Sequence, residues 1–190
     1  MKIQYPEIGI CCLSCRLCPQ LYTDGQSRCG GCKTETRISV GCPFITCALK
    51  RKGVEFCWEC DESETCEKWK KHREAGKKAD SFTCYQKLED NICFIRKNGI
   101  DIFQTLQKTR EDLLRIMLNE FNDGRSKSFY CIAATILEIA ELEDVLAQAN
   151  NESTGMDMKG KARILHALLE ETGKQQGYCL KLRRKERSKG

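Results

Sequence analysis

The spacing of hydrophobic residues divides this chain into two unlike parts. From Cys84 onward, apolar residues recur about every 3.6 positions, the period of an amphipathic helix. The period predicts four helices, which short connections would join into a compact antiparallel bundle. Their expected ranges are about 84–98, closed by Asn98-Gly99, then 103–121, 128–149 and 162–173. Their apolar stripes are Tyr85, Leu88, Ile92 and Ile95; Phe103, Leu106, Leu113, Leu114, Met117 and Phe121; Ile132, Ala133, Ile136, Leu137, Ala140, Val145 and Leu146; and Ala162, Leu165, Leu168 and Leu169.

Residues 1–66 lack this period and are rich in glycine, cysteine and charge. Such a segment cannot bury enough apolar surface to fold alone, so bound metal would have to supply folding free energy. A helix is expected from a Ser63 cap to Ala75, with Gly76 as its stop. From Tyr178 onward, apolar and polar residues alternate with a period of two. This pattern fits either a short edge strand or a solvated tail.

These patterns together predict a mainly α protein in three parts. An irregular, cysteine-rich, metal-stapled domain would occupy residues 1–80. A small helical bundle would follow over 81–177, and a basic tail would occupy 178–190.

Cysteine is the residue type that most narrows the chemistry. Eleven of the fifteen cysteines lie in the first 66 residues, and three Cys-x-x-Cys pairs occur among them: Cys15/Cys18, Cys29/Cys32 and Cys57/Cys60. Two sulfurs at this spacing can reach one ion from a tight turn. The N-terminus lacks the apolar core of a secretory signal, so we expect a cytoplasmic protein with reduced thiols. Metal binding is therefore favoured over a disulfide framework, which the odd cysteine count also disfavours.

The sequence indicates which cysteines are candidate metal ligands, but it does not show which of them share one metal ion. Cys15/Cys18 and Cys29/Cys32, ten residues apart, have the spacing of a four-thiolate site. Five later cysteines compete for four places in a second site, Cys12 adds a further ambiguity, and Cys84 could complete a site. The candidate metal ligands are Cys11, Cys15, Cys18, Cys29, Cys32, Cys42, Cys47, Cys57, Cys60 and Cys66.

Zinc is the preferred metal, with two or more ions, and an iron–sulfur cluster is the alternative. Knuckles such as Cys29-Gly-Gly-Cys32 are typical of zinc ribbons and fingers. The run Cys12-x2-Cys15-x2-Cys18-Pro19 looks instead like part of a ferredoxin motif, although its fourth cysteine is missing.

The same residues resemble a prokaryotic, cysteine-rich family catalogued as domain of unknown function 3795, over about residues 8–70. The family opens with Cys-Gly-Leu-Asp-Cys-x-x-Cys, where this chain has Cys11-Cys-Leu-Ser-Cys15-Arg-Leu-Cys18. Its later motifs are matched by Cys29-Gly-Gly-Cys32, Cys47-Ala48, Lys52-Gly53, Cys57-Trp-Glu-Cys60 and Cys66-Glu-Lys68. Cys12 replaces the family's glycine, and Ser14 replaces its aspartate. The resemblance implies metal binding and a bacterial or archaeal source, and it brings no established activity.

Charge suggests two further hypotheses. The tail carries six basic residues and one acid from Cys179 onward, 6 − 1 = +5, which equals the net charge of the chain. With the basic run Lys68–Lys78, it makes nucleic acid a weaker candidate partner. A separate anion site could form where a helix begins beside basic residues. Its candidates are Arg125, Ser126, Lys127 and Ser128.

No sequence motif indicates an enzyme. A nucleophile–base pair, a glycine-rich phosphate loop and a His-x-x-x-His helix are all missing from the sequence. His72 and His166 are expected to be core or surface residues. The sequence therefore predicts a non-enzymatic, zinc-binding interaction or regulatory module with a protein partner, and the alternative is an iron–sulfur redox or cluster-carrying protein.

Overall fold

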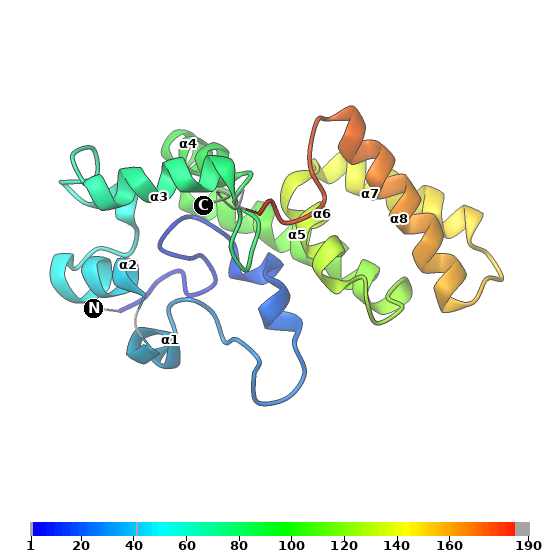
Figure 1. Ribbon diagram of the computed structural model, residues 1–190, viewed down its shortest axis with the longest axis horizontal. Helices are drawn as coiled ribbons and strands as arrows, with labels where there is room; N and C mark the ends of the chain where they lie inside the picture. The colour runs from blue at the N-terminus through cyan, green and yellow to red at the C-terminus, as the bar shows by residue number, and fades with distance from the viewer. Residues whose placement is uncertain (1, 41, 185–190) are drawn as a thin grey trace, which may run out of the picture.

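The computed structural model describes residues 2–40 and 42–184, and within them it is helical without any β-strand (Figure 1). The predicted mainly α class is thus confirmed. None of the described helices is long and apolar enough to span a bilayer. The elements in chain order are η1 (Cys15–Leu17), η2 (Pro19–Tyr22), α1 (Glu35–Val40), α2 (Pro43–Ile45), η3 (Thr46–Lys52), η4 (Cys57–Glu59), α3 (Glu67–Lys78), α4 (Leu88–Asn98), α5 (Ile100–Glu120), α6 (Lys127–Ile136), α7 (Ile139–Glu152) and α8 (Met158–Gln175).

The cysteine-rich part is made of short helical turns because proline and glycine repeatedly start and stop them. Pro19 and Pro43 occupy the first positions of η2 and α2, where the fixed φ of proline suits a helix start. Gly53, with φ of 66°, ends the π-helical turn η3 in the left-handed conformation. The result is a chain of short pieces with cysteines at or near their ends.

Helix α3 begins and ends later than the sequence indicated. Cys66, and not Ser63, is its N-terminal flanking residue, and the helix continues through Gly76 to Lys78. A Cβ at Gly76 would lie 3.2 Å from Leu88 of α4, so glycine here permits close packing of two helices. Its role is to allow a contact between helices and not to end one.

The long helices follow the predicted stripes closely. Gly99, with φ of 89°, separates α4 from α5 as expected. Helix α5 is the longest and packs against α4, α6, α7 and η1. In Figure 1 it runs from the end of the molecule that holds α3 and α4 toward the end that holds α7 and α8.

The single helix expected over 128–149 is in fact two, α6 and α7, and this prediction was wrong. Glu138 is extended (φ −72°, ψ 153°), and its backbone N–H donates to the Glu141 carboxylate in a capping box. From α5, Arg110 Nη1 donates to the carbonyls of Ala134 and Leu137, which the end of α6 leaves free. These two sets of hydrogen bonds stabilise the break.

The C-terminal segment returns from α8 and docks on the end of α3, and its described residues form no strand (Figure 1). Leu180 packs against Gly173 of α8. Arg183 donates to the buried Asp80 carboxylate and to the carbonyls of Gly76 and Lys77. A cation in this position satisfies the free carbonyls at the C-terminus of α3.

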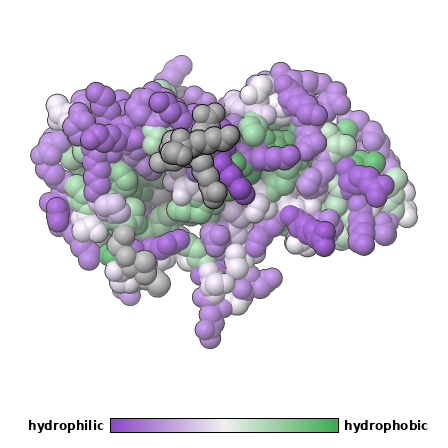
Figure 2. Space-filling model, viewed as in Figure 1, coloured by the Kyte–Doolittle hydropathy of each residue, from purple (hydrophilic) through white to green (hydrophobic). Residues whose placement is uncertain are grey.

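Buried side chains form clusters that cross residue 80. One cluster joins Ile8, Cys12, Leu13, Phe56 and Trp69 to apolar residues of α4 and α5. A second and larger cluster, built mainly from α5 to α8, also includes Leu17. The cysteine-rich part is therefore packed on the helices and buries its apolar residues against them. On the face shown in Figure 2 the outer surface is largely hydrophilic, and hydrophobic atoms show mainly between the helices.

Candidate metal centre

Four of the later cysteines line one small cavity of about 40 Å³. They are Cys47 of η3, Cys57 of η4, Cys60 after η4 and Cys66 before α3. Apolar side chains, among them Val54 and Trp69, line the same cavity. The sequence could not decide which of the five later cysteines belong together; Cys42 does not line this cavity.

A pair of backbone hydrogen bonds explains how these thiols are brought together. The N–H of Cys60 donates to the carbonyl of Cys57 at 3.4 Å, closing a 3₁₀ turn. The N–H of Cys66 donates to the carbonyl of Glu62 at 2.8 Å, in the turn that leads into α3. Each bond orients a cysteine through local backbone geometry, as expected for a metal-ligand turn.

The thiols of this group affect one another electrostatically. The pKa of Cys57 is raised to about 12, mainly by burial and to a smaller extent by the neighbouring Cys11, Cys47, Cys66 and Cys60. Like-charged thiolates at this range destabilise one another, and a bound cation would remove that cost.

The earlier pairs form a second thiol group around Cys15 and Cys32. The N–H of Cys32 donates to Cys15 Sγ at 3.3 Å, and the N–H of Cys18 donates to the Cys15 carbonyl at 3.1 Å. Hydrogen bonding from the Cys32 thiol lowers the pKa of Cys15, whereas the same bond and burial raise the pKa of Cys32. The pKa of Cys18 is raised mainly by burial, then by Cys32 and Cys29. The grouping of Cys15/Cys18 with Cys29/Cys32 on one ion stays a prediction.

Cys11 and Cys42 lie beside this earlier group. Burial raises the pKa of Cys11 to about 12, with smaller contributions from Cys32 and Cys42. A Cβ built on Gly9 would lie 3.6 Å from Cys11 Sγ and 3.9 Å from Cys32 Sγ, so these two sulfurs share one neighbourhood. The earlier group therefore has more sulfurs near it than one four-coordinate ion uses.

Cys12 has a different role in the backbone. Its φ is 64°, and it is the only non-glycine residue with positive φ among those the structure describes. This conformation is costly for a residue with a Cβ and easy for glycine. The Cys12 side chain is fully buried in the apolar cluster with Ile8 and Phe56.

The thiols as placed do not yet surround an ion. Across residues 2–40 and 42–184, no group of three or more histidine, cysteine, aspartate or glutamate side chains could hold a metal as it stands. The donor chemistry nevertheless fits a thiophilic metal, because thiols dominate both groups and four of them line one cavity.

The remaining cysteines and both histidines lie elsewhere. Cys84 and Cys131 are buried in the large helical cluster, whereas Cys93 and Cys179 are exposed. Cys84 has Asp80 and Arg183 as charged neighbours and does not join either thiol group. His72 packs among Phe44, Trp69 and Tyr85, and His166 stacks on Phe129 at 4.0 Å. Both histidines are half-buried, and these are ordinary ring-packing contacts.

The four candidate anion-binding residues do not face one hollow. Arg125 and Ser126 line an open depression with Lys159, Arg163 and His166, but Ser126 Oγ already bonds Asp123 and His166, each at 2.8 Å. Lys127 points the other way, where its Nζ donates to the Tyr22 carbonyl. Ser128 lines a third cavity beneath η2.

The basic tail is only partly available to a partner. Arg183 is held by Asp80, while Lys181 and Arg184 are exposed. Lys185, Arg187 and Lys189 lie outside the described residues.

Comparison with known proteins provides no relative from which a function could be transferred. No family model matches the chain, and neither a curated protein nor a solved structure matches it.

Proposed function

We propose that this chain is a non-enzymatic zinc protein whose thiolate sites fix the cysteine-rich part onto the helices, leaving a rigid surface for a protein partner. The observation that carries the proposal is the cavity lined by Cys47, Cys57, Cys60 and Cys66. Four thiolates are the complete ligand set of a structural zinc ion.

Two ions per chain are proposed. The later ion would take the four cavity cysteines, and the earlier ion would take Cys15, Cys18, Cys29 and Cys32. Cys11 and Cys42 would flank the earlier ion. Zinc supplies a tetrahedral cross-link that neutralises thiolate charge. Reduced thiols of this kind fit the cytoplasm, which is the proposed compartment.

Such a cross-link would connect several short segments of the fold. The later group spans η3, η4 and the start of α3, so one ion would join three segments separated by loops. Trp69 lines the same cavity and is 2% exposed in the cluster that includes α4 and α5. Metal bound there would hold α3, and through it the cysteine-rich part, against the helices.

An iron–sulfur protein is the second candidate, and one observation favours it. Cys11 and Cys42 add sulfur near the earlier group, and the resulting sulfur-rich environment would suit a cluster as well as an ion. Nucleic-acid binding through the tail and Lys68–Lys78 is the weaker alternative, since Arg183, Arg73 and Lys77 are already paired with carboxylates.

Metal analysis of protein purified without oxygen separates these proposals. We expect two zinc ions per chain and no acid-labile sulfide. Cys57→Ser should lower the zinc content by about one ion, because each thiolate is one of four ligands. The matched control is Cys93→Ser, whose thiol is exposed on α4 and should leave the content unchanged. Iron with acid-labile sulfide would overturn the zinc proposal in favour of the cluster.

A further inference from the structure

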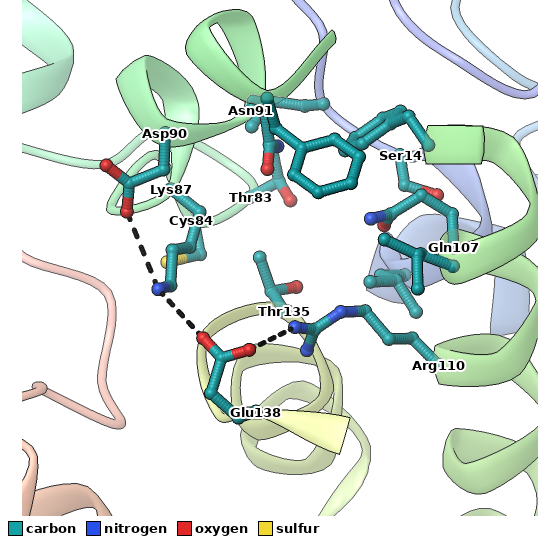
Figure 3. Close-up of a pocket in the computed structure, with 15 residues that line it drawn as sticks. Ser14, Thr83, Cys84, Lys87, Asp90, Asn91, Gln107, Arg110, Thr135 and Glu138 are labelled. Carbon is teal, nitrogen blue, oxygen red and sulfur yellow. Dashed lines mark hydrogen bonds and ion pairs between the residues drawn. The ribbon is translucent and has the colours of Figure 1, made fainter. Parts of the chain in front are cut away.

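Another cavity, of about 140 Å³, lies between η1 and the helices, away from the cavity of the four later cysteines (Figure 3). Its walls come from three separate regions of the chain: residues 13–17, the start of α4 with the preceding loop, and α5 together with the α6–α7 junction. Neither the sequence pattern nor the proposed metal chemistry accounts for this space.

Two cations border the cavity with hydrogen-bonding capacity left over. Arg110 is 9% exposed; its Nη1 donates to two carbonyls of α6, and Nη2 lies 3.6 Å from Glu138. In the described part of the chain, no hydrogen bond uses its Nε or Nη2. Lys87 Nζ donates to Glu138 at 3.3 Å, lies 3.5 Å from Asp90 and sits 4.8 Å from the centre of the Tyr178 ring, so its contacts with carboxylates are long. The Nε–Nη2 edge of an arginine is the edge that grips a carboxylate with two parallel bonds.

Polar groups without partners also line this space. Ser14 Oγ is buried and has no hydrogen-bond partner among the residues that the structure describes. Gln107 is 6% exposed, and no hydrogen bond within residues 2–40 and 42–184 uses its side-chain amide. Figure 3 shows both residues on the α5 side of the cavity, across from Lys87. Buried polar groups of this kind require a partner, which water or a ligand can supply.

The rest of the wall is apolar. Leu13, Leu17, Phe94, Phe103 and Leu106 line the cavity, and Phe103 is 2% exposed. A cavity of roughly 150 Å³ has room for a benzene ring. The space therefore suits a small apolar body that carries one polar head.

Glu138 indicates which head group fits. Its carboxylate already bridges Lys87 and Arg110, as the dashed lines of Figure 3 show, yet its side chain is 64% exposed. It reaches the two cations from the solvent side. A ligand carboxylate could bridge the same cations from within the cavity, where less water competes.

We propose that this cavity binds a small apolar monocarboxylate, its carboxylate held by Lys87 and Arg110 and its hydrophobic body against Phe94, Phe103 and the leucines. Inorganic phosphate would leave the apolar wall unmatched. A cation would have to compete with Lys87 and Arg110 for the carboxylates of Asp90 and Glu138, which line the same cavity. This site is independent of the proposed zinc chemistry, because no metal ligand is required to bind the carboxylate.

The test is calorimetry with full-length protein, metal as purified, at pH 7. The probes are benzoate, phenylacetate and hexanoate, with benzamide as the neutral analogue and inorganic phosphate as the second anion. We expect saturable one-to-one binding of at least one carboxylate. Lys87→Met should weaken it roughly tenfold, the loss of one charge-assisted hydrogen bond. The matched control, Lys108→Met, removes a half-exposed lysine of α5 that does not line the cavity and should leave the affinity unchanged.

Two further variants make the result specific to this cavity. Glu138→Gln removes the competing charge but keeps an acceptor for the start of α7, so carboxylates should bind more tightly. Ser14→Leu fills the space and should abolish binding, while circular dichroism verifies that the helices remain. If none of the carboxylates bound, the cavity would hold water alone, and that result would overturn the proposal. So would equal binding of benzamide, binding of phosphate alone, or a Lys87→Met affinity equal to wild type.

Discussion

The two parts of this molecule bury their side chains in different ways. In the region of α5 to α8, apolar stripes pack on one another, and the fully buried Tyr130 hydroxyl donates to the Phe121 carbonyl at 2.9 Å. In the cysteine-rich part, buried apolar residues are interspersed with thiols and polar groups. Of the four buried side-chain polar atoms without partners in the described residues, three belong to Ser14, Arg16 and Trp58.

This difference shows that packing alone accounts for the helices but not for the cysteine-rich part. The short turns there bury their apolar residues against α4 and α5, and cross-links would add to their stability. The candidate cross-links are the proposed metal ions and the long-range ion pairs. Removing any of these cross-links, or the strained backbone at Cys12, should change the stability of the protein by a different amount.

Of these changes, removal of the proposed metal should reduce the stability of the protein most. A structural zinc ion contributes on the order of 10 kcal/mol to folding. Chelation under reducing conditions should therefore abolish amide protection over residues 2–66 and weaken it in α3 and α4, which share their apolar cluster. Helices α7 and α8 should keep protection because they belong to the other cluster. Hydrogen exchange read by mass spectrometry measures this, and uniform loss along the chain would show that the two parts fold as one unit.

The buried pair Lys33–Glu55 should give the next largest effect. Lys33 Nζ lies 2.8 Å from Glu55 and also donates to the Tyr5 carbonyl, while Glu55 accepts from the N–H groups of Gln4 and Tyr5. Lys33→Met leaves Glu55 as an uncompensated buried charge, so we expect a loss of about 3–5 kcal/mol in denaturant unfolding. Lys50→Met, at an exposed lysine of η3, is the matched control and should change little.

The same pair predicts a pH dependence. Burial alone would raise the pKa of Glu55, but Lys33 and the two backbone N–H groups outweigh it and lower the pKa. The stabilisation is thus complete above the unfolded pKa, roughly 4.3, and is lost as pH falls through the lower folded value. In Lys33→Met the unpaired carboxyl protonates more readily, so the difference in stability between variant and wild type should narrow on acidification. A difference that stays constant from pH 7 to pH 4 would contradict this account.

The ion pair between Arg183 of the C-terminal segment and Asp80 should contribute less to the free energy of unfolding. Asp80 is fully buried at its side chain and is held by Arg183 at 2.9 Å. Because burial alone would raise the pKa of Asp80 and Arg183 lowers it, Arg183→Met leaves a carboxylate that the site no longer compensates. We expect a loss of about 2–3 kcal/mol and faster exchange at the end of α3. The neighbouring exposed arginine provides the control, Arg184→Met, which should be neutral. Equal effects of the two substitutions would mean that the tail is solvated.

The sequence predicted those features that depend on local pattern. The stripes of α4 and α5 and the glycine between them are readable because each is set by residues close in sequence. The break at Glu138 was missed because Arg110, more than twenty residues away, satisfies the carbonyls that it frees. The partition of the later cysteines, and the cavity beside Lys87, depend on contacts between distant segments. Spacing along the chain carries no information about such contacts.

Cys12→Gly should have the smallest effect, because two opposing terms nearly cancel. Glycine would relieve a left-handed backbone that costs a cysteine about 1 kcal/mol. It would also remove a fully buried thiol and add freedom to the unfolded chain, a loss of similar size. We therefore expect unfolding free energy within about 1 kcal/mol of wild type and an unchanged metal content, whereas Cys15→Ser should release about one ion. If Cys12→Gly also released an ion, Cys12 would be a ligand, and its backbone conformation would serve the metal site instead of the turn alone.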